Sequence, residues 1–210
     1  MSHQELKRYT SIPALLYLLN NRALTLLDPK SWDDTNDSYC LSLYKEKKQL
    51  TTLVALCFTE TAETYHHWHV FAGGTSGACI TFDREKLLEG LTPTRGFRHG
   101  PVEYLSLEDM RRTPPALSAL PFVKRIGYQH ECEFRILFEH KTRPQKQKDV
   151  PISIDSIRKI ALNPWLPKPL VATMRSTIAS IEGCERLNKY VFRSTLTGNT
   201  EWKELAKGAA

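Results

Sequence analysis

The order of apolar and polar positions divides the chain into predicted strands and helices. Continuous runs of apolar and β-branched residues, typical of buried strands, occur at residues 23–27, 52–59, 77–83 and 157–162. Apolar residues at helical spacing follow Ser11, a good N-cap, and recur over 169–181, so helices are predicted in both places. Together these elements predict an α+β fold with a central mixed or antiparallel sheet and flanking helices.

Residues 128–140 alternate between polar and apolar side chains in the manner of a strand. The alternation places Glu131, Glu133 and Arg135 on one face. Two carboxylates and a guanidinium on one rigid face are candidates for catalysis. The same carboxylates can instead pair with Arg135 and Arg125 across a sheet, and alternation does not separate these two interpretations.

The composition is that of an ordinary globular protein. The chain has 210 residues, of which 41% are hydrophobic and 25% charged, and one domain is expected over 1–210. Its core motifs would occupy 7–140, and the helix and strands of 151–210 would complete the fold. The net charge of +6 favours phosphate-bearing partners, because binding them releases condensed counterions.

Cysteine usage and the N-terminus point to the cytoplasm. The five cysteines are scattered, odd in number and never arranged as C-x-x-C, so reduced thiols are expected. The first thirty residues lack the pattern of a secretory signal, and no apolar run approaches the ~20 residues that span a bilayer. We therefore expect a cytoplasmic protein with no membrane partner.

Two polar clusters invite a metal assignment. His66, His67 and His69 flank Trp68, but adjacent histidines converge poorly on one ion, so a polar stacking surface is the preferred interpretation. A second set of carboxylates and a lysine is typical of a metal-dependent nuclease and comprises Asp28, Asp33, Asp34, Asp37, Glu131, Glu133 and Lys124. Capping and solvation explain most loop carboxylates, and no metal is expected.

Four segments together resemble a bacterial family catalogued as a domain of unknown function. Its R/K-Y-x-S, P-x-x-F-N-D-P-F-E, W-x-x-Y-A-x-x-H-x-G-hydrophobic-F and E-x-E-x-R motifs correspond to Arg8–Ser11, Pro29–Asp37, Trp68–Ala72 with Gly77–Phe82, and Glu131–Arg135. The chain departs from these motifs at Trp32-Asp33-Asp34, at Phe71 in place of tyrosine and at Ser76 in place of histidine. The resemblance covers about residues 7–140 and names no reaction.

A weaker resemblance, in the opening strand–helix–strand unit and the late glutamate strand, is to ADP-ribosyltransferase toxins. It implies an ADP-ribosyltransferase-like fold, NAD as a substrate, and Glu133 or Glu131 as the catalytic carboxylate. The residues implied for NAD binding are Arg8, Tyr9, Thr10, Trp68 and Phe71. Those implied for binding the acceptor are Arg135 and Tyr128.

The expected function is therefore that of an NAD-dependent ADP-ribosyltransferase, acting as a toxin or phage-defence effector on RNA or DNA. A protein target and an antitoxin or chaperone partner are also compatible with the resemblance. Two alternatives stay open: a non-catalytic nucleic-acid-binding module, and a metal-dependent nuclease. The basic composition suits all three, because each binds phosphate groups.

Overall fold

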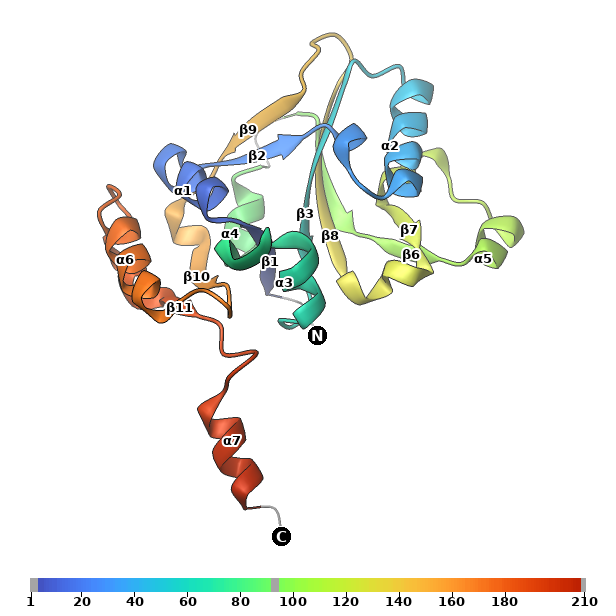
Figure 1. Cartoon of the computed structure of the whole chain (residues 1–210). Coiled ribbons are helices and arrows are strands. Elements are labelled where there is room, and N and C mark those ends of the chain that lie inside the picture. The colour runs from blue at the N-terminus through green and yellow to red at the C-terminus, as the bar shows by residue number, and fades with distance from the viewer. Residues whose placement is uncertain (1–3, 92–94, 209–210) are drawn as a thin grey trace. The chain divides into compact units, whose positions relative to one another are not determined.

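The computed structural model describes residues 4–91 and 95–208 of the chain. It has the predicted α+β class, with helices flanking strands in mixed, mostly antiparallel pairing (Figure 1). The chain divides into unit 1, Met1–Lys7, Arg22–Thr61 and Asp83–Ser156, and unit 2, Arg8–Asn21, Ala62–Phe82 and Ile157–Ala210. The single domain and the ADP-ribosyltransferase-like fold stay predictions.

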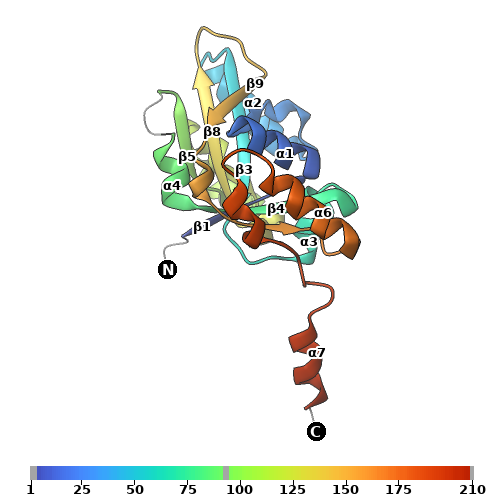
Figure 2. The ribbon, with the colours of Figure 1, turned by 90° about the vertical axis from the view of Figure 1, so that its left-hand side faces the viewer.

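Unit 1 is built on two long antiparallel strands, β3 (Thr52–Thr59) and β8 (Glu133–His140), which run side by side in Figures 1 and 2. Their register pairs Cys57 with Arg135 and Thr59 with Glu133. The other strands of unit 1 also pair antiparallel. β2 (Ala23–Leu27) pairs with β3 and, on its other edge, with β9 (Gln147–Pro151). β5 (Phe97–Pro101) pairs with β8, and the Glu5–Lys7 part of β1 (Glu5–Ser11) pairs with β3.

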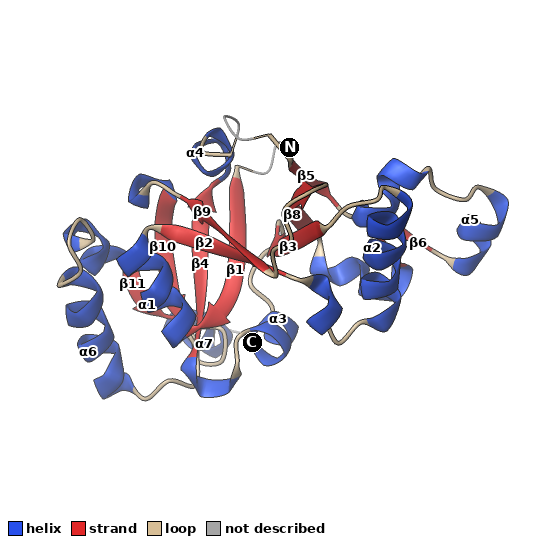
Figure 3. Ribbon diagram, turned by 90° about the horizontal axis from the view of Figure 1, so that it is seen from above, coloured by secondary structure: helices blue, strands red, loops and turns tan. Residues whose placement is uncertain are grey.

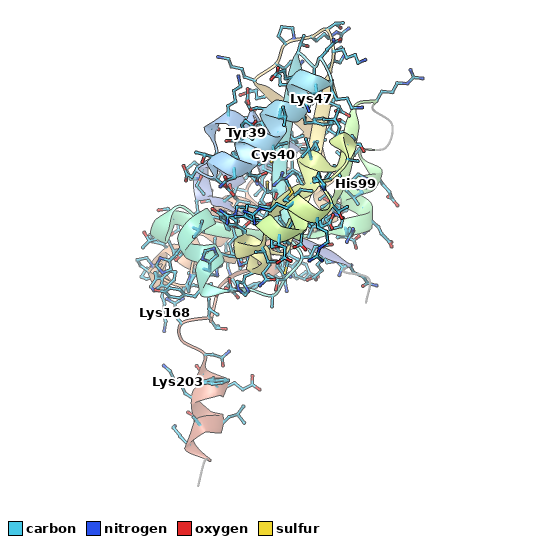
Figure 4. The ribbon with its side chains drawn as sticks, turned by 90° about the vertical axis from the view of Figure 1, so that its right-hand side faces the viewer. Tyr39, Cys40, Lys47, His99, Lys168 and Lys203 are labelled. Atoms are coloured by element: carbon cyan, nitrogen blue, oxygen red, sulfur yellow. The ribbon has the colours of Figure 1, made fainter. Side chains whose placement is uncertain are left out.

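Helix α2 (Thr35–Lys47) packs on this part of the sheet through Leu41 and Tyr44, which join a buried apolar cluster with Leu137. Figure 4 labels Tyr39, Cys40 and Lys47 along the same helix. The other regular elements of unit 1 are α4 (Arg84–Glu89), β6 (Glu103–Leu105), α5 (Leu107–Arg112) and β7 (Val123–Arg125), with β6 and β7 parallel.

Unit 2 has its own strands and core. Its strands are the end of β1, β4 (Gly77–Asp83), β10 (Ile157–Leu162) and β11 (Val191–Arg193), and β4 belongs to this unit as far as Phe82. Its helices are α1 (Ile12–Asn21), α3 (Tyr65–Phe71), α6 (Lys168–Ala179) and α7 (Thr200–Lys207). Strand β10 pairs antiparallel with β4 and parallel with β11, beside which α6 lies in Figure 3. Tyr9, Trp68 and Cys79 form a buried cluster with two alanines.

Most predicted strands are confirmed, and two sequence predictions are wrong. Residues 28–37 are polar and dense in turn formers, which predicts a loop, but 29–31 form a short helical turn and α2 begins at Thr35, capped by Asp34. The strand expected over 128–140 begins only at Glu133, because 126–131 form a 3-10 turn and Cys132 has a left-handed backbone with φ of 43°. Polar helix faces and single left-handed residues leave little trace in a hydrophobicity pattern.

Along the described part of the chain, each helix is too short or too polar to cross a bilayer. All five cysteines are free thiols, and two of them, Cys79 and Cys184, are buried. Buried cysteine thiols pack as small apolar groups, so these two contribute to the interior of unit 2.

Candidate functional site

Charged side chains meet in the interior of unit 1, where apolar packing would be the default. The set, here called the buried charge cluster, comprises Asp37, Lys124, Glu131, Glu133 and Arg135. Every carboxylate in it lies within 4.0 Å of a lysine or arginine nitrogen. Buried charges persist only when they are paired and hydrogen-bonded, and the cluster meets that condition.

Arg135 is the centre of the cluster and is 0% exposed. Its two Nη atoms donate to both carboxylate oxygens of Asp37, at 2.9 and 2.7 Å, and its Nε donates to Glu133 at 2.7 Å. One Nη also donates to the Pro121 carbonyl at 2.8 Å, and the guanidinium lies 5.0 Å from the Trp32 ring centroid. A planar guanidinium suits these bidentate and stacking contacts in a way that a lysine does not.

Lys124 links the two glutamates. Its Nζ lies 2.6 Å from Glu131 and 3.4 Å from Glu133, and 4.0 Å from Asp37. The ammonium also lies 4.6 Å from the centroid of the Tyr128 ring, a cation–π contact. The lysine side chain is 9% exposed, so water screens these charges weakly.

Three local features bring the glutamates together. Pairing of β8 with β3 fixes Glu133, whose backbone N–H donates to the Tyr104 hydroxyl at 2.8 Å. The left-handed residue Cys132 turns the chain just before the strand. The Thr59 hydroxyl then holds the preceding turn by donating to the Glu131 carbonyl at 2.6 Å. Both carboxylates reach Lys124 even though only Glu133 is part of the strand.

Burial and charge act in opposite directions on the titratable groups. Burial raises the pKa of the Asp37 carboxyl above its usual range and outweighs Arg135. At Glu133 burial also favours the neutral acid, but the charge and hydrogen bonds of Arg135, with Lys124, hold the pKa below its ordinary value. Burial would lower the pKa of Lys124, and the carboxylates of Glu133 and Glu131 raise it instead. The glutamate and the lysine are therefore ionised at neutral pH.

The structure places the sequence-predicted residues in two groups. Glu131, Glu133, Arg135 and Tyr128 lie in unit 1; the first three are buried, and Tyr128 is 37% exposed. The residues predicted to bind NAD are all in unit 2: Arg8, Tyr9, Thr10, Trp68 and Phe71. Their roles stay predictions.

Within unit 2, two of these residues pack together in the core. The Tyr9 and Trp68 rings are 5.1 Å apart and perpendicular, and the Trp68 ring is 0% exposed. The Trp68 indole N–H donates to Glu63 at 2.5 Å, and the Ser194 hydroxyl donates to the same carboxylate. Phe71 is 41% exposed and so keeps a surface on which a ligand can pack.

Sequence reasoning missed parts of the buried charge cluster. Asp37 was named only in the nuclease alternative and was placed in a loop, although the Asp34 cap that precedes it is a signal of the helix that positions it. Tyr104 contacts Glu133 and Trp32 contacts Arg135, and each pair is far apart in sequence. The residues around Tyr104 and Trp32 carry no pattern that predicts these contacts. Lys124 was named only in the nuclease alternative.

Among residues 4–91 and 95–208, no three or more histidine, cysteine or acidic side chains are grouped so as to hold a metal ion. Comparisons of the chain with protein-family models, with curated proteins and with solved structures find no match.

Proposed function

We propose that the chain is an NAD-dependent ADP-ribosyltransferase that modifies nucleic acid, with Glu131 as its catalytic carboxylate. The observation that carries the proposal is the convergence of Glu131 and Glu133 on the Lys124 ammonium, at 2.6 and 3.4 Å. Arg135 and the pairing of β8 with β3 hold Glu133 in one position. An enzyme benefits from charges that are already oriented before the substrate arrives.

The reaction explains why a fixed carboxylate is useful. The bond between the ribose C1′ and the nicotinamide nitrogen breaks, and its electron pair leaves with neutral nicotinamide. Positive charge develops on the ribose, as it does in glycoside hydrolysis, and a nearby carboxylate stabilises it. The acceptor atom of the nucleic acid then bonds to C1′ and releases its proton to solvent. No metal or external oxidant is needed to balance these steps.

Glu131 is preferred to Glu133 because of its surroundings. The Glu133 side chain is 5% exposed and binds both Arg135 and Lys124, so it acts as an internal counter-ion. The Glu131 side chain is 9% exposed and binds Lys124. The ring of Tyr128, which lies over the Lys124 ammonium, is partly exposed, at 37%. Of the two carboxylates, Glu131 is the more accessible to a substrate.

The test is transfer of label from NAD that is radioactive at its adenylate phosphate, with single-stranded RNA and DNA as acceptors. Release of nicotinamide is measured in parallel, so that turnover is seen even when the acceptor is wrong. We expect Glu131→Gln to abolish both signals. The matched control is Glu108→Gln, because that glutamate lies on α5 with its side chain 75% exposed, and it should leave both unchanged.

Loss of activity must be separated from loss of structure, because Glu131 is a buried partner of Lys124. Glu131→Asp keeps the negative charge and is expected to retain part of the activity, and thermal unfolding of each variant reports its fold. The proposal fails if folded wild-type protein neither releases nicotinamide nor transfers label. The choice of Glu131 fails if Glu131→Gln works as the wild type does, and a catalytic role for either carboxylate fails if Glu133→Gln does so as well.

A second candidate, a metal-dependent nuclease, draws on the same convergence. Asp37, Glu131 and Glu133 meet Lys124 from α2, the 126–131 turn, β8 and β7. Among the described residues these acids are not grouped so as to hold a metal ion, so a nuclease would have to rearrange them to bind Mg²⁺. Cleavage of the same oligonucleotides in Mg²⁺, stopped by EDTA and independent of NAD, would favour it. ADP-ribosyl transfer that persists in EDTA would exclude it.

A further inference from the structure

Three rings form an exposed aromatic patch on unit 2, here defined as Tyr65, His69 and Trp165. The ring centroids of Tyr65 and His69 are 4.2 Å apart, those of His69 and Trp165 4.8 Å, and those of Tyr65 and Trp165 5.5 Å. Tyr65 is 60% exposed and Trp165 36% exposed. Exposed aromatic groups in mutual contact are unusual on a surface without a partner.

Local structure holds the rings in place. Tyr65 and His69 are one helical turn apart on α3, so their side chains share a face. Trp165 is presented by a turn after β10 that the buried side chain of Asn163 organises. That amide donates to the Gly74 carbonyl at 2.7 Å, and its oxygen accepts the Trp165 backbone N–H at 2.9 Å. The patch is thus fixed in place before any ligand arrives.

The charge of the chain is concentrated in the same unit. Unit 2 contains ten Lys and Arg against five Asp and Glu, a net +5, whereas unit 1 contains nineteen against eighteen, a net +1. Lys168, labelled in Figure 4, begins α6 three residues after Trp165 and is exposed. A basic unit attracts anions and repels a second copy of itself.

Unit 2 also contains an open groove of about 430 Å³. Its lining is three basic side chains with one acidic and one amide: Arg175, Arg186, Lys189, Glu185 and Asn188. The Arg175 Nε donates to the Val191 carbonyl at 2.6 Å, and an Arg186 Nη donates to the Ile157 carbonyl at 3.2 Å, so both side chains are held in place. Net positive charge in a groove suits phosphate groups.

We infer that the aromatic patch binds single-stranded nucleic acid by stacking bases on its rings, with the basic side chains of unit 2 attracting the backbone. Stacking on aromatic rings combined with backbone electrostatics is the common physical basis of single-strand recognition. The inference deepens the proposed function by naming the surface that would bind the nucleic acid. A neutral apolar protein partner would use the rings but would gain nothing from the charge.

The test is fluorescence anisotropy of labelled 12-nucleotide oligo-dT and oligo-U, with the full chain and without NAD. The patch variant is Tyr65→Ala with Trp165→Ala. The matched control is Tyr17→Ala with Trp202→Ala, which removes the same two residue types at positions of unit 2 that are 47% and 76% exposed. We expect about 10-fold weaker binding by the patch variant, the scale on which stacking losses are felt, and an unchanged Kd for the control.

Two further measurements report the mechanism. Tyr65→Phe keeps the ring and should retain wild-type affinity, which shows that stacking rather than the hydroxyl is required. Affinity should fall steeply with salt for wild type and patch variant alike, because the phosphate contacts are kept in both. Similar Kd values for oligo-dT and oligo-U are expected, since every base has a ring face.

The inference is overturned if the wild type does not bind at 50 mM salt, or if its affinity does not fall as the salt concentration is raised. An equal loss of affinity in the patch and control variants overturns it as well. It is also overturned if the patch variant binds normally but loses self-association in sedimentation, since the rings would then contact a second copy. Binding is measured without NAD. A protein that binds oligonucleotides but transfers no label would therefore sink the proposed function and leave this inference standing.

Discussion

Replacing Arg135 with methionine tests whether the buried charge cluster is held by its central guanidinium. The substitution keeps much of the apolar stem and removes four hydrogen bonds, two to Asp37, one to Glu133 and one to Pro121. Asp37 and Glu133 are 3% and 5% exposed in the structure, and in the variant Lys124 would be their neighbouring cation. Breaking a buried ion pair on one side costs about 3–5 kcal/mol of unfolding free energy.

Protonation sets a ceiling on that cost. A stranded carboxylate can accept a proton, at about 1.4 kcal/mol for each pH unit above its ordinary pKa. For Asp37, with an ordinary pKa of 3.8, the ceiling is about 4 kcal/mol at pH 7 and about 2 kcal/mol at pH 5. The loss caused by Arg135→Met should therefore be about 4 kcal/mol at pH 7 and should shrink by up to about half at pH 5.

Urea denaturation at both pH values measures the loss. Arg125→Met is the matched control, because that arginine ends β7 with an exposed side chain, and it should change the free energy of unfolding by less than about 0.5 kcal/mol. Adding Asp37→Asn to Arg135→Met should recover part of the loss, since one stranded charge is gone. A loss of the same size at pH 7 and pH 5 would refute the reasoning, because packing rather than charge would then be its cause.

Three further outcomes follow from other contacts. Gly77→Ala should destabilise the chain strongly, because the added Cβ would lie 2.1 Å from a backbone carbonyl oxygen, whereas Gly127→Ala meets nothing within 4 Å and serves as the control in thermal unfolding. Ser194→Ala should cost about 1–3 kcal/mol in urea titrations, because it removes a hydroxyl that donates to the Glu63 carboxylate. The pKa of Glu133 is lowered, so its contribution to stability is present above its ordinary pKa of 4.5 and is lost as pH falls through the lower folded value; Glu133→Gln should flatten this acid limb of stability against pH.

The strongest sequence signals correspond to elements whose local pattern and tertiary role agree. Residues 52–59 and 77–83 are almost wholly buried strands, and their continuous apolar character predicted them with the observed bounds. Ser11 accepts the backbone N–H of Ala14 at 3.3 Å, as its expected capping role requires. In such places the information that determines structure is local, so one sequence suffices.

Sequence analysis missed helices and strands that form because of a neighbouring element and not because of their own hydrophobic pattern. Helix α2 has few apolar residues, and Leu41 and Tyr44 are buried only because the sheet of unit 1 covers them. Strand β9 is polar and forms because β2 offers it five paired positions, Ala23↔Pro151 to Leu27↔Gln147. Polar edge strands of this kind are typical of sheets that avoid aggregation, and they carry little hydrophobic signal.

The segment 131–135 shows how a partly wrong structural prediction can still identify a site. Alternation placed both glutamates and Arg135 on one strand face, whereas Glu131 ends a 3-10 turn and Cys132 reverses the local backbone. The convergence that the alternation implied is nevertheless present, because Lys124 reaches both carboxylates from β7. The two glutamates are brought together by Lys124 and not by the alternation of side chains along a strand. Charge complementarity across distant segments is therefore a better guide to this cluster than strand alternation.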